Sequence, residues 1–171
     1  MEIILQKELP HQQDAMNAVC NVFDKVGLYG PKAYYENPTI SHDRPRIAAN
    51  IAKVQRDMGI PAEHKGIGLS DGCLNLDVKM ETGTGKTYVY THTIYELNRL
   101  YGFNKFIIAV PSLAIKAGTG QFISDTYVRR HFRDACGYGT EIELGVLEPV
   151  KKKKKGHSYF PTVVAEFVKG S

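Results

Sequence analysis

The chain has 171 residues, 43% hydrophobic and 23% charged, which suffices for one packed domain of ordinary size. No apolar run approaches the ~20 residues of a membrane span, and the N-terminus lacks the basic and then apolar layout of a signal peptide. We therefore expect a soluble, cytoplasmic protein with no membrane partner. Three distant cysteines and six scattered histidines argue against a disulfide framework and a structural zinc site.

The net charge of +4 comes from one run of five lysines at 151–155, and removing their charges leaves a balance of −1. Such a run can contact nucleic-acid phosphates, or it can be a solvated hairpin tip, and the second interpretation is favoured. The body of the chain is therefore nearly neutral.

Two helices are predicted before residue 60. Pro10 opens the first, whose apolar residues recur at helical spacing until Gly27 ends it. Pro45 opens the second, which Gly59 ends. The whole span 28–72, with its irregular and polar connections, is interpreted as a long insertion, and such insertions are often functional.

The middle of the chain predicts a strand at 73–80, a helix at 86–100 and a nearly unbroken apolar strand at 105–113. Unbroken apolar strands are typical of parallel sheets covered on both faces, so this order predicts a right-handed βαβ unit. A further helix is expected at 119–136 and a strand at 140–148. The fold class is therefore α/β, with a parallel sheet flanked by helices.

The stretch TGTGKT lies between the first predicted strand and the helix that follows it. Gly83 and Gly85 allow a tight turn whose N–H groups converge on an anion at the positive end of the helix. Lys86 would reach the β- and γ-phosphates, and the Thr87 hydroxyl would bind Mg²⁺. This is the phosphate cradle of P-loop NTPases, although Met80 replaces the first glycine of the general pattern.

The predicted cofactors are therefore ATP and Mg²⁺, with Lys86 as the catalytic residue and Thr87 as the metal ligand. The predicted phosphate-binding residues form one continuous run: Thr82, Gly83, Thr84, Gly85, Lys86 and Thr87. The alternative is a glycine-rich turn that matches by chance. It is disfavoured because the strand, the turn and the helix all fall where the motif requires them.

Two further segments resemble motifs of superfamily 2 helicases. The segment LPHQQDA resembles their adenine-recognition element, in which a glutamine amide meets N6 and N7 of the base, and Gln12 aligns better than Gln13. The segment 110–116 resembles a turn that contacts a nucleic-acid phosphate, with Pro111, Ser112 and Lys116 as candidates. The alternatives are exposed polar residues in the first segment, and a strand end with a solvated lysine in the second.

Together these segments resemble the restriction (Res) subunit of type III restriction-modification enzymes, most densely at 79–118 and moderately at 1–27. The resemblance implies a RecA-like ATPase stimulated by double-stranded DNA. It also implies a modification methyltransferase partner and DNA cleavage by a separate nuclease domain, so that the whole protein is an ATP-dependent endonuclease of a restriction system.

No acidic pair for Mg²⁺, no second RecA-like domain and no nuclease cluster can be identified, and Glu148 is the nearest candidate carboxylate. We therefore expect residues 1–171 to be the N-terminal part of the first RecA-like domain, with an incomplete sheet and no activity alone. Within it, 1–27 would be the adenine-recognition region, 28–72 the insertion and 73–171 the P-loop core. The alternatives are another superfamily 2 helicase, a type I restriction motor, or a small self-contained phosphotransferase.

Overall fold

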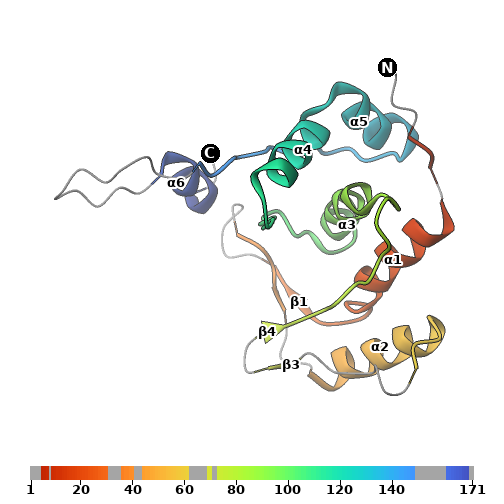
Figure 1. Cartoon of the computed structure of the whole chain (residues 1–171). Coiled ribbons are helices and arrows are strands. Elements are labelled where there is room, and N and C mark those ends of the chain that lie inside the picture. Colours follow the sequence, from red (N-terminus) through yellow and green to blue (C-terminus); the bar gives the residue numbers. More distant parts are fainter. Residues whose placement is uncertain are drawn as a thin grey trace.

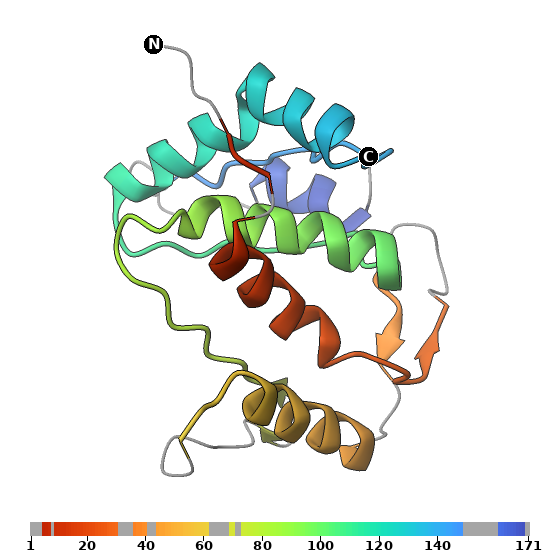
Figure 2. The same cartoon turned by 90° about the vertical axis from the view of Figure 1, so that its right-hand side faces the viewer.

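The computed structural model describes residues 5–7, 9–30, 36–40, 44–61, 69–70, 73–148 and 161–169. Helix α3 lies in the middle, with α1 on one side of it, α4 and α5 on the other, and α2 beyond α1 (Figures 1 and 2). The helices are α1 (Pro10–Asn21), α2 (Arg44–Asp57), α3 (Lys86–Tyr101), α4 (Leu113–Ser124), α5 (Thr126–Arg130), the π-helical turn η2 (His131–Ala135) and α6 (Thr162–Lys169). The strands are β1 (Leu28–Tyr29), β2 (Thr39–Ile40), β3 (Leu69–Ser70) and β4 (Cys73–Leu74).

Three helices begin where the sequence predicts them. Helix α1 has Pro10 in its first turn, α2 includes Pro45, and α3 begins directly after Gly85. Gly102 ends α3 in the left-handed conformation, with φ of 72°, and its N–H donates to the carbonyl of Asn98. Glycine adopts this conformation without the steric cost that other residues incur, so it commonly ends helices.

The single helix predicted at 119–136 is wrong, because the chain forms α4, α5 and η2 there. Ser112 starts α4 earlier, accepting a hydrogen bond from the N–H of Ile115. Asp125 is extended, and its carboxylate accepts hydrogen bonds from the N–H groups of Tyr127 and Val128 at 2.8 and 3.2 Å. A capping aspartate begins a new helix. The apolar periodicity of residues 119–136 therefore spans a break at Asp125, although it predicted one continuous helix.

The described part of the insertion packs against the rest of the chain. Ile47 and Ile51 of α2 form a buried cluster with three residues after α1: Val22, Phe23 and Val26. The buried Asn50 amide donates to the carbonyls of Val22 and Asp24 at 3.0 and 2.8 Å. It thereby supplies hydrogen-bond donors to carbonyls that follow the C-terminal end of α1. Helix α2 is therefore an integral part of the fold.

Asn37 joins the β1–β2 hairpin to the segment that follows α3. Its carbonyl oxygen accepts hydrogen bonds from the N–H groups of Asn104 and Lys105, both at 2.7 Å, and its amide donates to the Lys105 carbonyl. These hydrogen bonds hold the residues just before β2 against the start of the apolar segment 105–113.

A second core cluster lies between α3 and the α5–η2 unit. Tyr88 and Tyr95 of α3 stack on the fully buried ring of Phe132, with centroid distances of 5.3 and 4.8 Å. Glu96, on the same helix, forms an ion pair with Arg99 and accepts a hydrogen bond from the Tyr138 hydroxyl at 2.8 Å. The hydrogen bond from Arg99 is the main reason why the pKa of Glu96 is lowered.

The parallel sheet is not confirmed. Within 73–80 only Cys73–Leu74 is a strand, and it pairs antiparallel with Leu69–Ser70. The segments 105–113 and 140–148 contain no strand in the described structure; Figures 1 and 2 draw 105–112 and 140–148 as tubes without arrows, and α4 begins at Leu113. A strand requires a partner, and hydrophobic patterning reports burial without identifying which segment supplies the partner.

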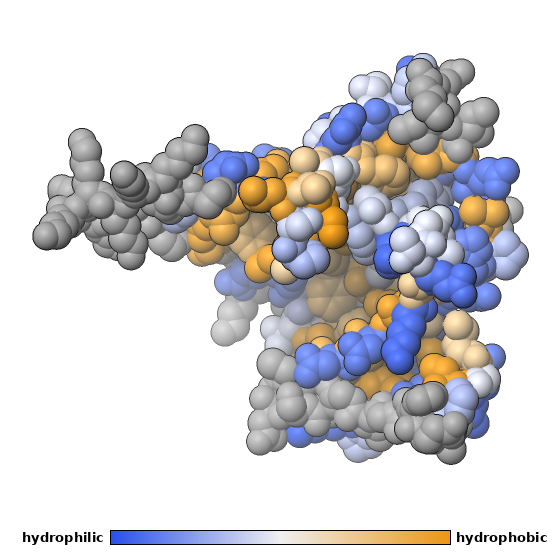
Figure 3. All heavy atoms as spheres, viewed as in Figure 1, coloured by the Kyte–Doolittle hydropathy of each residue, from blue (hydrophilic) through white to orange (hydrophobic). Residues whose placement is uncertain are grey.

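Apolar side chains of these extended segments lie at the surface. Ile107 is 82% exposed, and Val78 and Val146 are nearly half exposed. Figure 3 shows hydrophobic residues at the surface on the side that carries the extended segments. The apolar segment 163–168 lies in α6, and the lysine run 151–155 lies outside the described residues. Within the described residues, no helix is both long and apolar enough to cross a membrane.

Candidate nucleotide-binding site

The predicted phosphate loop forms a tight turn at the start of α3. Gly83 and Gly85 have φ of 84° and 85°, a left-handed conformation that side chains with a Cβ rarely adopt. Gly85 is the N-cap of α3, and no side chain caps this end. The first N–H groups of α3 are therefore available to an anion, which the positive end of the helix dipole also favours.

Lys86 closes over this turn. Its ammonium group donates to the carbonyls of Glu81 and Met80 at 2.8 and 3.3 Å, and the Thr84 hydroxyl donates to the same Glu81 carbonyl at 2.7 Å. The Lys86 side chain is exposed at the surface of the loop. Phosphate oxygens are stronger partners for an ammonium group than neutral carbonyls, so a phosphate can compete for this side chain.

The remaining threonines of the motif differ in exposure. Thr82 is exposed, whereas Thr84 and Thr87 are half-buried. Thr87 lies in the first turn of α3, where its main-chain carbonyl accepts a hydrogen bond from the Thr91 hydroxyl at 2.8 Å. Thr87 also lines a cavity beside the loop, so its side of the helix faces open space.

The structure brings Gln12 to the phosphate loop. Its side chain is 7% exposed, and its amide donates to the carbonyl of Thr84 at 3.0 Å. A Cβ atom on Gly85 would lie 2.5 Å from the Gln12 amide nitrogen, so the glycine also makes room for this contact. Gln13 is half-buried and does not line the cavity beside the loop.

His11 is a loop contact that the sequence interpretation missed. In the tautomer that carries its proton on Nε2, this ring donates to the same Thr84 carbonyl at 3.2 Å. The residue does stand in the quoted segment LPHQQDA, beside Gln12. No local pattern signalled this contact, because it depends on how the start of α1 packs against the loop, 73 residues away in sequence.

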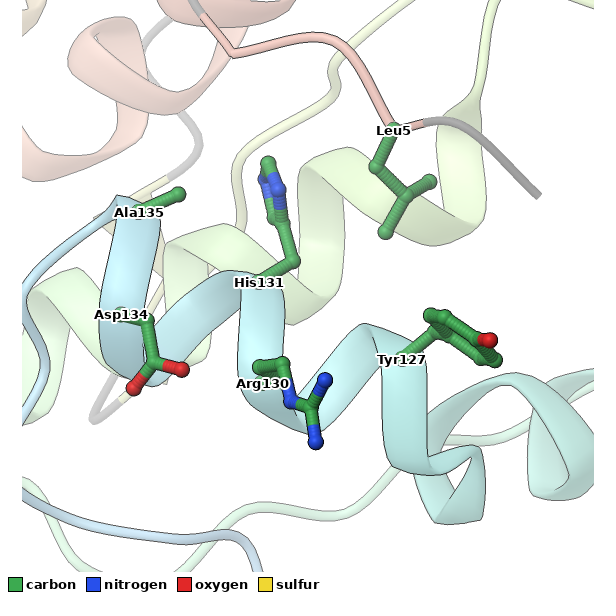
Figure 4. Close-up of a pocket in the computed structure, with 6 residues that line it drawn as sticks. All are labelled: Leu5, Tyr127, Arg130, His131, Asp134 and Ala135. Atoms are coloured by element: carbon green, nitrogen blue, oxygen red, sulfur yellow. The ribbon is translucent and has the colours of Figure 1, made fainter. Parts of the chain in front are cut away.

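Leu5 of the N-terminal segment lines two cavities. The first, of about 290 Å³, lies beside the loop and is lined by Leu5, Gln6, Leu9, Gln12, Gly85, Thr87, Tyr88 and Phe122. The second, of about 300 Å³, is lined by Leu5, Tyr127, Arg130, His131, Asp134 and Ala135. Figure 4 shows that Arg130 and Asp134 point away from Leu5, so the polar groups of the second cavity do not converge.

Tyr88 and His131 connect the two cavities. The Tyr88 hydroxyl and Nε2 of His131 are 2.9 Å apart, and each side chain lines one cavity. Burial raises the pKa of Tyr88, and burial together with Lys7 lowers the pKa of His131. Both groups are therefore neutral at pH 7, and the pair adds no charge to either cavity.

The candidate nucleic-acid contacts lie at the start of α4. The Ser112 hydroxyl caps this helix, accepting from the N–H of Ile115 at 3.2 Å, and Pro111 beside it is exposed. Lys116 donates to the carbonyl of Leu147 at 2.6 Å and forms an ion pair with Glu148 at 3.1 Å. Helix α4 also contributes Phe122 to the cavity beside the phosphate loop, and its Thr119 hydroxyl is hydrogen-bonded to Tyr90 of α3.

Comparisons with known proteins identify the family of the chain. Residues 6–136 match the family described as "Type III restriction enzyme, res subunit". The chain is 41% identical to the Res subunit of the type III restriction-modification enzyme EcoPI from Escherichia phage P1, and the alignment covers 97% of the chain and 17% of the relative. It is 39% identical to the EcoP15I Res subunit of Escherichia coli, with 98% of the chain and 17% of that relative covered.

A third relative, the StyLTI Res subunit of Salmonella typhimurium, is 35% identical over 98% of the chain and 14% of its own length. The chain thus spans about one sixth of the length of these relatives. The family match covers most of the chain and includes the whole phosphate loop. The chain therefore belongs to the Res subunit family of type III restriction enzymes, which are helicase-like P-loop proteins.

Proposed function

We propose that the chain is the ATP-binding part of an ATP-dependent restriction endonuclease, which cleaves double-stranded DNA together with a modification methyltransferase subunit. The observation that carries this proposal is the uncapped start of α3, framed by two left-handed glycines and the Lys86 ammonium group. The names of its relatives, which are type III restriction-modification enzymes, support the larger activity.

The residues of the loop fit a Mg²⁺–nucleotide. The turn of 82–85 offers main-chain N–H groups, Lys86 offers a positive charge, and Thr87 offers a hydroxyl for the metal ion. The metal ion would neutralise charge on the phosphates during phosphoryl transfer. Gln12 holds the loop in shape through the Thr84 carbonyl, which keeps the N–H groups oriented before the nucleotide arrives.

We further propose that the start of α4 contacts the DNA backbone. The exposed residues Pro111 and Ser112 leave this helix end accessible, and Lys116 supplies a positive charge beside it. Contacts of this kind fix the position of a protein on DNA without reading its sequence. The Lys116–Glu148 ion pair would have to exchange for a phosphate when DNA binds.

The extended segments support the assignment to a RecA-like domain whose sheet is incomplete. Segments 75–80 and 105–112 are extended, and the apolar Val78 and Ile107 are exposed where partner strands would cover them. Because the chain covers about one sixth of its relatives, we propose that residues outside it complete the sheet and supply the acidic Mg²⁺ ligand and the nuclease. The chain alone would then bind nucleotide weakly and hydrolyse little of it.

The test is Lys86→Ala in the longer protein that carries this chain, assayed for ATP-dependent DNA cleavage with the methyltransferase subunit present. Lys53→Ala, an exposed lysine on α2, is the matched control. Lys86→Ala should abolish cleavage without changing the thermal unfolding midpoint, whereas Lys53→Ala should cleave normally. Retained cleavage by Lys86→Ala would refute the role of the loop.

A further inference from the structure

We propose that the hydroxyl pair of Tyr90 and Thr119 links the phosphate loop to the DNA-contacting end of α4. The pair sets by how much DNA binding changes the affinity for the nucleotide, so both are positioning residues that contact neither ligand. This inference rests on the proposed function, because it requires nucleotide at the loop and DNA at the start of α4. It adds two residues that the sequence did not single out.

The pair connects the two helices directly. Helix α4 lies beside α3 in both Figure 1 and Figure 2. The Tyr90 hydroxyl and Oγ1 of Thr119 are 2.8 Å apart, and either oxygen can donate. In the part of the chain that the structure describes, this is the only hydrogen bond that joins α3 to α4. Thr119 is 8% exposed, and a buried hydroxyl without a partner is costly, so the contact ties the positions of the two helices together.

On α3, the pair lies one turn from the phosphate loop. Lys86 and Tyr90 are four residues apart, so they occupy the same face of the helix. The N–H of Val89 donates to the carbonyl of Gly85 at 3.0 Å, which closes this first turn by regular hydrogen bonding. A phosphate that draws Lys86 away from the Glu81 carbonyl therefore acts on the turn that carries Tyr90.

On α4, Thr119 is the first buried residue. Every residue of 113–118 is exposed except the half-buried Lys116. Thr119 follows Lys116 by three positions and Ser112 by seven, which is the spacing of one helix face. The face that is proposed to meet DNA thus reaches the protein interior first at Thr119.

DNA binding would remove the other polar contacts of this helix end. Lys116 donates to the Leu147 carbonyl and pairs with Glu148, and both contacts would exchange for a DNA phosphate. The Tyr90–Thr119 hydrogen bond involves neither of these partners, so it stays in place and carries a displacement of α4 to α3. A neutral hydrogen bond accounts for about a two- to tenfold change in an equilibrium, and this is the size of coupling that the pair can supply.

The experiment measures the affinity for a non-hydrolysable ATP analogue with and without saturating duplex DNA, in the complex of the longer protein with its methyltransferase subunit. The ratio of the two affinities is the coupling factor. The variants are Tyr90→Phe and Thr119→Val, which each remove one hydroxyl, and Thr119→Ser, which keeps it. Tyr101→Phe is the matched control, because the Tyr101 hydroxyl joins α3 to the Cys20 carbonyl of α1 at 2.8 Å.

We expect DNA to change the wild-type affinity by a factor of about five or more. Tyr90→Phe and Thr119→Val should each bring this factor about threefold closer to one. The double variant should lose no more than either single change, because both break the same contact. Thr119→Ser and Tyr101→Phe should keep the wild-type factor. Nucleotide affinity without DNA should change by less than about twofold in every single variant, which separates a lost link from a general loss of structure.

If Tyr90→Phe and Thr119→Val keep the wild-type factor while Lys86→Ala abolishes nucleotide binding, the link is refuted and the proposed ATP site stands. An equal loss in Tyr101→Phe also refutes it, as do losses that add in the double variant. If wild-type binding depends on Lys86 but DNA leaves it unchanged, the link alone is refuted. If wild-type binding does not depend on Lys86, the ATP site fails and this inference fails with it.

Discussion

The side-chain amide of Gln12 donates to the main-chain carbonyl of Thr84 at 3.0 Å, across 72 positions of sequence. Helix α1 thereby holds the phosphate loop in place, and Gly85 is the residue against which the amide packs. The loop geometry depends on this contact as well as on the conformational freedom of its glycines.

The two loop glycines separate these contributions. They have nearly the same φ, but a Cβ on Gly83 would meet nothing within 4 Å, whereas one on Gly85 would meet the Gln12 amide at 2.5 Å. Gly83→Ala should cost about 1–2 kcal/mol of left-handed strain. Gly85→Ala should cost more and should weaken nucleotide binding further. Urea denaturation and ATP titration of both variants measure the difference, and equal effects would contradict the Gln12 contact.

Asn50 should be important for stability although it is far from the loop. Its buried amide satisfies the carbonyls of Val22 and Asp24, so Asn50→Ala leaves two acceptors without this partner. We expect a loss of about 1–3 kcal/mol in the free energy of unfolding, measured by urea denaturation. Lys53→Ala on the exposed side of the same helix should change it by less than about 0.5 kcal/mol. Equal small effects would show that α2 is not anchored by Asn50.

The Glu96–Tyr138 hydrogen bond should stabilise the chain in a pH-dependent way. The pKa of Glu96 is lowered below its ordinary 4.5, chiefly by Arg99, so its contribution is present above pH 4.5 and is lost as the pH falls through the lower folded value. Tyr138→Phe should therefore cost about 2 kcal/mol at pH 7 and less near pH 3. Urea denaturation at both pH values tests this, with the exposed Tyr127→Phe as control. A loss that does not vary with pH would exclude the carboxylate as the partner.

Glu148 should compete with DNA for Lys116. The ion pair is partly exposed, so it contributes about 0–1 kcal/mol, and Glu148→Gln should raise DNA affinity up to about fivefold. Lys116→Ala should weaken binding and reduce the slope of log affinity against log salt by about 1. Fluorescence anisotropy over a salt series measures both quantities. The control is Glu143→Gln, an exposed carboxylate with no ion pair in the described part of the chain.

Helix positions could be read from the sequence because their signals are local. Pro10, Pro45 and Gly85 each lie at or next to the start of a helix, where their conformational preferences favour one. The break at Asp125 was also local, since a capping aspartate signals a helix start, but the apolar periodicity across 119–136 obscured it. Strand pairing is not local, because the partner of segment 105–113 is set by residues far away in the chain.

The candidate site also combines features that local sequence predicts with features that depend on distant residues. The order of residues 82–87 predicted a tight turn before α3, and the turn is present. The contact of Gln12 with Thr84 and the place of Gln6 beside the cavity depend on how α1 packs against α3, which no local pattern encodes. The roles of Gln12, Gln13 and the start of α4 in binding remain predictions.

Helix α4 has Ser112 as its cap and carries Phe122 near its other end. Its 12 residues form a rod about 18 Å long, and the hydrogen bond between Thr119 and Tyr90 joins it to α3. We expect a helix of this length to move as one body, so a displacement of its cap would also move the Phe122 ring that lines the cavity beside the phosphate loop. DNA binding at the start of α4 and nucleotide binding in that cavity would then be coupled through the movement of α4.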